Sequence, residues 1–281
     1  MPLAWYALMA LLALRPEYRP DACERVFSSD ANKQACIDRQ EEGYAWAVEV
    51  SGWYQEEAIR WGFTTPIDII WAVADAMKES GLSRQDNMCL KSLQVERIVE
   101  RTELEAATET KPARYRLCWT YSENRRNCQV VWLLAEDDER VYLDTCAAGE
   151  VGPYQLLSNQ IPGRSETDVN GDGEITRADG GYVLPWGETL STSLAVRRTQ
   201  ARDWRVGIHL GLRVLREERD RCCSEDAECA ASWEWLGAHK MGVCESELGD
   251  AYVRRTREYV DTSIAYLCQQ MPLDLLCVPQ N

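Results

Sequence analysis

The 281-residue sequence has no excess of basic residues, only two histidines and no C-x-x-C pair. Its 31 lysines and arginines stand against 46 aspartates and glutamates, which gives a formal net charge of −15. Because phosphate groups repel so acidic a chain, neither nucleic acids nor anionic membrane surfaces are expected partners. A zinc cluster would lack its usual ligands. The hydrophobic fraction of 45% argues against disorder.

Cysteine, in contrast, is abundant, with twelve residues, an even number. Since the spacing does not suit zinc, disulfide bonds formed in an oxidising compartment are the better explanation. We expect Cys23 to pair with Cys36, and Cys118 with Cys128, because each pair would close a short loop. The pairing of the vicinal Cys222–Cys223 stays open at this point. These cysteines favour an exported protein, located in the periplasm or outside the cell.

The N-terminal apolar run, residues 1–14, is too short to span a bilayer. It resembles the apolar region of a secretory signal, although no basic segment precedes it and no A-x-A cleavage site follows it. Residues 1–22 are therefore either a signal or an N-terminal apolar helix that packs on the domain. We favour export because of the cysteines, and we expect no firm membrane association. No feature of the sequence indicates an oligomeric state.

Apolar and aromatic residues recur at helical spacing from residue 23 to about 62, which predicts a helix. The next helix has clear start and stop signals. Thr65 can cap its N-terminus, Pro66 suits its first position, and Asp68 lies in the first turn, where the helix dipole favours an acid. Gly81 is the expected stop.

Between about residues 83 and 147 the apolar period changes from helical to two, as is typical of strands. The segments "RYRLCWTY", "CQVVWLLAE" and "RVYLDTC" predict a β-ribbon insertion. Its aromatic residues Trp119, Tyr121 and Trp132 are able to line a glycan cleft, but we prefer a small hydrophobic core for the insertion. The chain is then rich in loops to about residue 186 and helical nearly to its end.

The segment "DVNGDGEITRAD", residues 168–179, has the spacing of an EF-hand calcium loop. Calcium needs roughly six to eight oxygen ligands from a flexible loop, and alternate positions turn successive side chains inward. Gly173 falls at the sharp turn and Ile175 at the apolar position. Aspartate replaces the usual glutamate at the last position, and no second loop exists, so we expect a structural clamp. The predicted ligands are Asp168, Asn170, Asp172, Glu174 through its carbonyl, Thr176 and Asp179.

The helix predicted after Thr65 ends on a carboxylate, Glu79, although most of its residues are apolar. A helix C-terminus carries a partial negative charge, which disfavours a second negative charge nearby. Burial against Ala72 and Ala76 should disfavour the ionised form further. A carboxyl group that keeps its proton near neutral pH is what glycosidic cleavage needs as general acid. The alternative is a surface glutamate at a frayed helix end.

Several segments occur along the chain in the order of the motifs of one enzyme family. They are "KESGLSR" at Lys78, "GEVGPYQLL" at Gly149, "GIHLGLRVL" at Gly207, "LGAHKMG" at Leu236 and "DAYVRRTREYV" at Asp250. Together they resemble the lytic transglycosylases with a soluble-transglycosylase (SLT) catalytic domain. That family has the motifs E-S-x-F/L, G-A-x-G-L-M-Q-L, N-I-x-x-G-x-x-Y-L, A-Y-N-A-G and Y-V-x-x-V. The ordered set is more specific than any single motif.

The match to the family motifs is partial. Positions that agree are Glu79, Ser80, Leu82, Gly149, Gly152, Gln155, Leu156, Ile208, Gly211 and Leu215. Tyr154 stands in the methionine position of the second motif. In the fourth motif, His239 and Lys240 replace the tyrosine and asparagine of the family.

The resemblance implies a mainly α (α+β), lysozyme-like fold. Residues 23–281 would form a single catalytic domain with two insertions, the β-ribbon at about 83–147 and the EF-hand-like loop at about 158–186. Some members of this family carry a calcium-binding insertion, so structural calcium is the implied cofactor.

The function implied by the resemblance is cleavage of the bond between N-acetylmuramic acid and N-acetylglucosamine in peptidoglycan glycan strands. Glu79 would act as general acid and then base, and the product would be a 1,6-anhydro sugar. Ser80, Tyr154, Gln155 and His239 would bind substrate.

Two alternatives remain. His239 is able to hydrogen-bond Glu79 and help deprotonate water, which would make the protein a lysozyme-type muramidase. The protein would otherwise be a non-catalytic, calcium-dependent cell-wall-binding protein. His209, the other histidine, is interpreted as a packing or surface residue.

Overall fold

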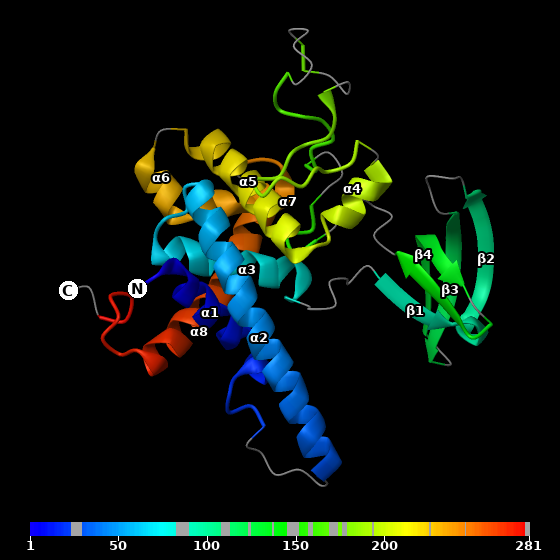
Figure 1. Ribbon diagram of the computed structural model, residues 1–281, viewed down its shortest axis with the longest axis horizontal. Helices are drawn as coiled ribbons and strands as arrows, with labels where there is room; N and C mark the ends of the chain where they lie inside the picture. Colours follow the sequence, from blue (N-terminus) through cyan, green and yellow to red (C-terminus); the bar gives the residue numbers. More distant parts are fainter. Residues whose placement is uncertain are drawn as a thin grey trace. The chain divides into compact units, whose positions relative to one another are not determined.

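The computed structural model describes residues 1–23, 30–82, 90–107, 113–122, 125–136, 138–144, 152–156, 160–168, 174–175, 179–192, 194–224, 226–244 and 246–278. Contacts divide the chain into two compact units. The helical unit comprises Met1–Arg84 and Gly207–Asn281, and the second unit comprises Gln85–Val206. The protein is mainly α-helical with a small antiparallel sheet, as the sequence predicts (Figure 1).

The helical unit is built around the packing of α1 against α2, α3 and α8. Short 3₁₀ turns at Pro16–Tyr18 and Glu234–Leu236 join some of its helices. The α-helices that contribute to it are α1 (Leu3–Leu14), α2 (Asp30–Arg60), α3 (Pro66–Ser80), α5 (Trp204–Cys223), α6 (Ala227–Ser232), α7 (Gly237–Met241) and α8 (Glu247–Gln270).

The N-terminal apolar run forms α1 and is buried in this unit. Ala7, Ala10 and Leu11 have no exposed surface, and the hydroxyl of Tyr6 donates to Asp274 Oδ2 at 2.8 Å. Burial and this neighbouring carboxylate raise the pKa of Tyr6 to about 12. Among the described residues, every helix is too short or too polar to cross a membrane.

Local signals set both ends of α3, as the sequence predicts. Thr65 caps the N-terminus, since its Oγ1 accepts from the Asp68 N–H at 3.3 Å while Asp68 Oδ2 accepts from the Thr65 N–H at 3.0 Å. Pro66 is the first helical residue. At the other end Gly81 has a φ of 68°, the left-handed conformation that glycine adopts without strain. These ends fix which turn carries Glu79.

The second unit contains a five-stranded antiparallel sheet with the order β1-β5-β4-β3-β2. The short helix α4 (Leu194–Gln200) also belongs to this unit. The strands are β1 (Leu90–Gln94), β2 (Ile98–Glu105), β3 (Arg114–Ser122), β4 (Arg125–Glu136) and β5 (Arg140–Asp144). The predicted ribbon therefore includes β3, β4 and β5, while β1 and β2 were not predicted individually.

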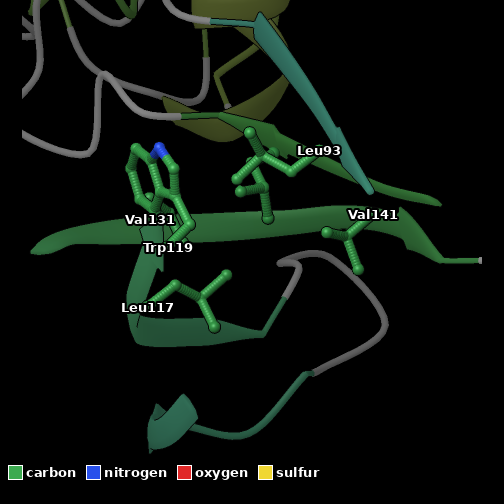
Figure 2. Packing of buried hydrophobic residues seen from close by; sticks show 6 residues of the cluster. Leu93, Leu117, Trp119, Val131 and Val141 are labelled. Atoms are coloured by element: carbon green, nitrogen blue, oxygen red, sulfur yellow. The ribbon is translucent and has the colours of Figure 1, made fainter. Parts of the chain in front are cut away.

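One face of the sheet carries a hydrophobic core (Figure 2). Burying a large apolar side chain contributes about 1.5–3 kcal/mol, so this core stabilises a sheet with little else to bury. Trp119 is fully buried in it, which confirms that this residue packs in a core and does not line a cleft. The buried members are Leu93, Leu117, Trp119, Val131, Val141 and Leu143.

Disulfide bonds cross-link segments within each of the two units. They include the two pairs predicted from the sequence, which are thereby confirmed. Cys118 and Cys128 lie directly opposite each other in the register of β3 and β4. The vicinal cysteines of α5 pair separately, one with Cys244 and the other with Cys229. The described bonds are Cys23–Cys36, Cys118–Cys128, Cys222–Cys244, Cys223–Cys229 and Cys268–Cys277.

Candidate functional site

Glu79 lies on the last turn of α3, and its side chain is half-buried. The helix reaches this point because its apolar residues pack against α1 and α8. The Gly81 N–H donates to the Met77 carbonyl at 2.8 Å and closes the helix. The hydroxyl of Ser80 donates to the Ala76 carbonyl, also at 2.8 Å, and is therefore engaged within its own helix.

A cation offsets the negative end of α3 beside Glu79. Arg15, which follows α1, donates from Nη1 to the carbonyl oxygens of Gly81 at 2.9 Å and Leu82 at 2.5 Å. Because these two residues directly follow the last helical residue, the guanidinium lies at the negative end of the helix dipole and weakens its effect. Arg15 belongs to a distant segment of the chain, so the sequence around Glu79 does not reveal this cation.

A buried aspartate lies one turn before Glu79. Asp75 has no exposed surface, and its Oδ1 accepts a hydrogen bond of 2.5 Å from the hydroxyl of Tyr252 on α8. Glu79 is the second carboxyl group close enough to this phenol to raise its pKa. Because residues four apart share a helix face, α3 presents two carboxyl groups to one hydroxyl. We call these three residues the carboxyl–phenol cluster.

The phenol of this cluster stays neutral. Burial first, and then the charges of Asp75 and Glu79, raise the pKa of Tyr252 far above its ordinary value. Tyr252 therefore keeps its proton and donates it throughout the physiological pH range. Lys78 places a cation near the same phenol, with its Nζ 5.9 Å from the centre of the Tyr252 ring.

His239 approaches the cluster from α7. Its Nε2 lies 3.8 Å from Asp75 Oδ2, a distance for an ion pair and too long for a hydrogen bond. Its Nδ1 is buried and has no hydrogen-bond partner among the described residues. The helices α7 and α8 come this close because Gly237 packs on Gly249, where a Cβ on Gly237 would lie 2.7 Å from the Gly249 Cα.

A second buried ionisable pair lies in the helical unit. His209 Nδ1, on α5, is 2.6 Å from Glu57 Oε2, on α2, and each side chain is only 1% exposed. Arg60 Nε lies 3.1 Å from the same Oε2. The ring of Trp61 lies against His209, with centroids 5.3 Å apart. Of the two interpretations of His209 from sequence, the structure shows packing.

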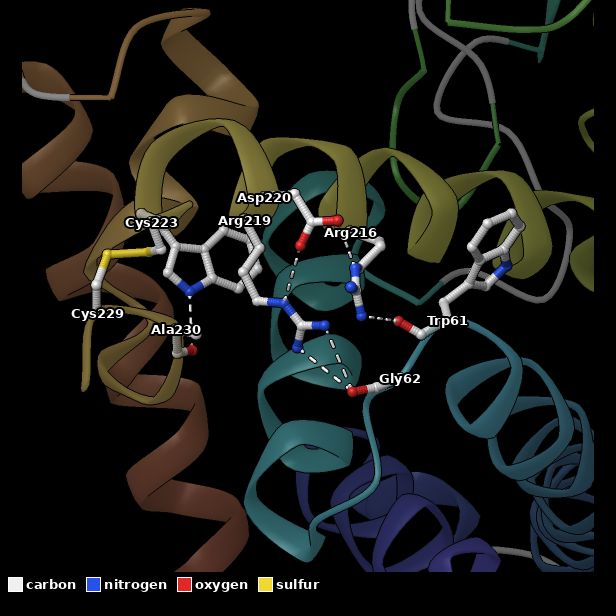
Figure 3. Close-up of polar contacts among 9 residues, drawn as sticks. Trp61, Gly62, Arg216, Arg219, Asp220, Cys223, Cys229 and Ala230 are labelled. Carbon is white, nitrogen blue, oxygen red and sulfur yellow. Dashed lines mark hydrogen bonds and ion pairs between the residues drawn. A yellow bond between two sulfur atoms is a disulfide. The ribbon is translucent and has the colours of Figure 1, made fainter. Parts of the chain in front are cut away.

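Arginines of α5 hold the end of α2 next to this pair (Figure 3). Arg216 donates to the Trp61 carbonyl at 3.4 Å, and Arg219 donates to the Gly62 carbonyl at 3.4 Å. Gly62 has a φ of 75°, and a Cβ there would lie 2.6 Å from Arg216 Nη1. The Glu57–His209 pair thus belongs to a close structural contact between α2 and α5.

The other predicted substrate-binding residues belong to the second unit. Tyr154 is fully buried. Gln155 has a φ of 48°, and its Nε2 donates to the carbonyl three residues earlier at 2.9 Å. A left-handed φ is uncommon outside glycine and is often found at functional sites. Glu79, Ser80 and His239 therefore lie in one unit, and Tyr154 and Gln155 in the other.

The predicted calcium loop is described only in part. Asn170, Asp172 and Thr176 lie outside the described residues, while Asp168, Glu174 and Asp179 lie within them. The Ser165 N–H donates to the Gly180 carbonyl at 3.0 Å and joins the two ends of the loop. The residues that the structure describes contain no group of three or more acidic, histidine or cysteine side chains arranged to hold a metal.

Sequence reasoning missed Asp75, Tyr252 and Glu57. Asp75 carried a signal, because it is the only charged residue in the apolar run between Asp68 and Lys78. A charge inside such a run is rarely buried without a partner. The identity of that partner could not be predicted, since Tyr252 is 177 residues away.

Comparison of this chain with protein-family models, with curated proteins and with solved structures found no match. The lysozyme-like fold, the catalytic glutamate and the calcium loop therefore stay predictions. Any assignment of function rests on the residues and the geometry described above.

Proposed function

We propose that this protein is an exported, periplasmic or extracellular lytic transglycosylase that cleaves the β-1,4 bond between N-acetylmuramic acid and N-acetylglucosamine in peptidoglycan. The main observation that supports this proposal is the position of the half-buried Glu79. It lies beside the phenol of Tyr252 and one helical turn after the buried Asp75. The ordered resemblance to the SLT motifs supports the same site. The disulfides of both units fit an exported protein.

In this reaction Glu79 gives its proton to the glycosidic oxygen, and the bond between that oxygen and C1 of muramic acid breaks. Glu79 then takes the proton of the C6 hydroxyl of the same sugar as that oxygen bonds to C1. The product carries a 1,6-anhydro ring, no water is consumed, and Glu79 regains its proton. One carboxyl group is enough because a hydroxyl of the substrate replaces the second group of the usual pair.

The two carboxyl groups of the carboxyl–phenol cluster differ in exposure, and this difference supports Glu79 as the acid. The phenol has a single proton, and Asp75 accepts it. Glu79 is half-buried and therefore accessible to a substrate. Asp75 is unsuited to protonate a glycan itself, because it has no exposed surface.

Ser80, Gln155 and His239 are proposed to bind the glycan, as the resemblance implies, whereas the fully buried Tyr154 has no surface to offer it. Ser80 and Gln155 each donate to a main-chain carbonyl of their own segment. Binding would exchange these hydrogen bonds for bonds to sugar hydroxyls.

Calcium is proposed as a structural cofactor of the second unit. The hydrogen bond between Ser165 and Gly180 closes the base of the loop, and its described ligands are oxygen-bearing, as calcium requires. No step of the proposed reaction uses the ion.

Hydrolysis, as in a lysozyme-type muramidase, is the second candidate. It is favoured by His239, which replaces the tyrosine of the family and lies 3.8 Å from Asp75. An imidazole beside a buried carboxylate is suited to take a proton from water. The net charge of −15 suits a defensive lysozyme poorly, since anionic cell walls would repel it.

The test is incubation of the purified protein with intact peptidoglycan, followed by mass spectrometry of the soluble fragments. Fragments with 1,6-anhydro ends support the transglycosylase, and reducing ends support the muramidase. Absence of fragments, together with calcium-dependent binding to the peptidoglycan, would instead identify a non-catalytic wall-binding protein.

A further inference from the structure

We propose that Asp75 is a positioning residue for Glu79 and acts through the hydroxyl of Tyr252. The inference rests on the proposed function, because it assigns Asp75 a part in the reaction of Glu79. Since Asp75 is fully buried, it does not touch substrate.

The contacts form a chain that runs from the buried Asp75 through the hydroxyl of Tyr252 to Glu79. Asp75 Oδ1 accepts the Tyr252 proton at 2.5 Å, which fixes the rotation of the hydroxyl. The same hydroxyl lies beside Glu79, whose side chain is the most exposed of the cluster. By fixing the hydroxyl of Tyr252, Asp75 therefore restricts the orientation of the half-buried Glu79.

Burying Asp75 is unfavourable unless its partners compensate, because a buried ionised group loses its hydration. The neighbouring α3 residues Ala72 and Ala76 are equally buried, so an apolar residue would suit packing at this position. The charged and titratable groups that face Asp75 are Tyr252 from α8, His239 from α7 and Glu79 from α3 itself. The role of Asp75 in orienting Tyr252 and Glu79 explains why this position holds an aspartate.

Holding Glu79 in one rotamer matters because a free glutamate samples many. A displacement of about 1 Å at a reacting group lowers a rate by roughly 100-fold. A phenol anchored on a buried carboxylate reduces that freedom before substrate binds. The gain appears in kcat and leaves substrate affinity unchanged.

The test compares Asp75→Asn, Tyr252→Phe and the double variant in kcat, KM and melting temperature. We expect Asp75→Asn to lower kcat about 10- to 100-fold with KM unchanged, as loss of a supporting group does. The double variant should lose no more than Tyr252→Phe alone, since Asp75→Asn weakens, by its neutral acceptor, the same chain of contacts that Tyr252→Phe breaks. Should Asp75→Asn fail to fold, Asp75→Ala replaces it, because alanine cannot accept from the phenol and suits the packing of the neighbouring Ala72 and Ala76.

Glu57→Gln is the matched control, because it also alters a buried carboxylate of the helical unit but one paired with His209. It should lower stability and leave the kcat of the folded protein unchanged. If Asp75→Asn keeps full kcat, or if its loss adds to that of Tyr252→Phe, the positioning role is wrong.

A second readout separates this inference from the proposed function. In carboxyl-¹³C-labelled protein, the resonance of Glu79 is identified by its loss in Glu79→Gln. It should shift in Asp75→Asn and in Tyr252→Phe, and by the same amount in the double variant as in Tyr252→Phe. If the wild-type protein cleaves no glycan, the proposed function fails, and an unchanged resonance would additionally refute the link through Tyr252.

Discussion

Two buried carboxylates of the helical unit, Glu57 and Asp75, differ in what lies beyond their partners. Glu57 is bonded to His209, which is as enclosed as Glu57 itself. Asp75 is bonded to Tyr252, which also contacts the half-buried Glu79. The group that leads from Glu57 to solvent is the guanidinium of Arg60, which keeps its proton. The group that leads from Asp75 and Tyr252 to solvent is a carboxyl group, which is able to give and take one. The kind of group that reaches the surface, more than burial, therefore distinguishes the candidate site.

The largest expected effect is on Glu79. Replacing Glu79 with glutamine should lower glycan release by at least about 10³-fold, because an amide neither gives nor takes the proton. The melting temperature should stay close to that of the wild type, since the amide is nearly isosteric. Glu49→Gln, an exposed change on α2, is the control and should keep full activity. If Glu79→Gln keeps its activity, Glu79 is not the catalytic acid, and the functional role assigned to the carboxyl–phenol cluster is wrong.

The structural role assigned to the Glu57–His209 pair is tested by replacing Glu57. Removing the charge of Glu57 by Glu57→Gln leaves His209 and Arg60 without their ionic partner. We expect a loss of stability on the order of 3 kcal/mol, the range for breaking a buried pair. Urea unfolding followed by circular dichroism measures it. A variant of unchanged stability but lower kcat would reverse the roles assigned to the two carboxylates.

Calcium removal should act on the second unit and leave the two buried pairs intact. With calcium at about 100 times its Kd, binding stabilises the folded state by about 2.7 kcal/mol, which chelation removes. Differential scanning calorimetry with and without a chelator detects the change. Asp168→Asn should make the protein insensitive to the chelator. A wild-type melting temperature that the chelator does not alter would count against the loop.

The smallest effect is expected at the start of α3. Thr65→Ala removes the side-chain cap of this helix and should lower stability by about 1 kcal/mol. The neighbouring Thr64→Ala, an exposed change outside the capping box, should have little effect. Both variants should keep full kcat, because the cap lies at the opposite end of the helix from Glu79.

Local chemistry could be predicted from the sequence where neighbouring residues determine it. Both ends of α3 follow from Thr65, Pro66 and Gly81. β3 was found because its apolar residues alternate, and β4 and β5 were found because they are short apolar runs typical of strands. β2 was missed because it is an edge strand exposed along most of its length, so alternation of burial, the usual signal, is absent.

The buried polar partners could not be predicted, because no local rule relates them. Tyr252 lies 177 residues from Asp75, and His209 lies 152 residues from Glu57. Their meeting depends on how α3 packs against α8 and how α2 meets α5. The sequence resemblance indicated Glu79, but only the packing shows the groups that surround it.

The central claim is that Glu79 cleaves a glycan without water, and digestion in water labelled with heavy oxygen tests it most directly. Mass spectrometry of the released fragments should find 1,6-anhydro ends free of the label, and Glu79→Gln should release none. Labelled reducing ends would contradict the transglycosylase and establish hydrolysis. Equal release by the wild type and Glu79→Gln would contradict the site itself.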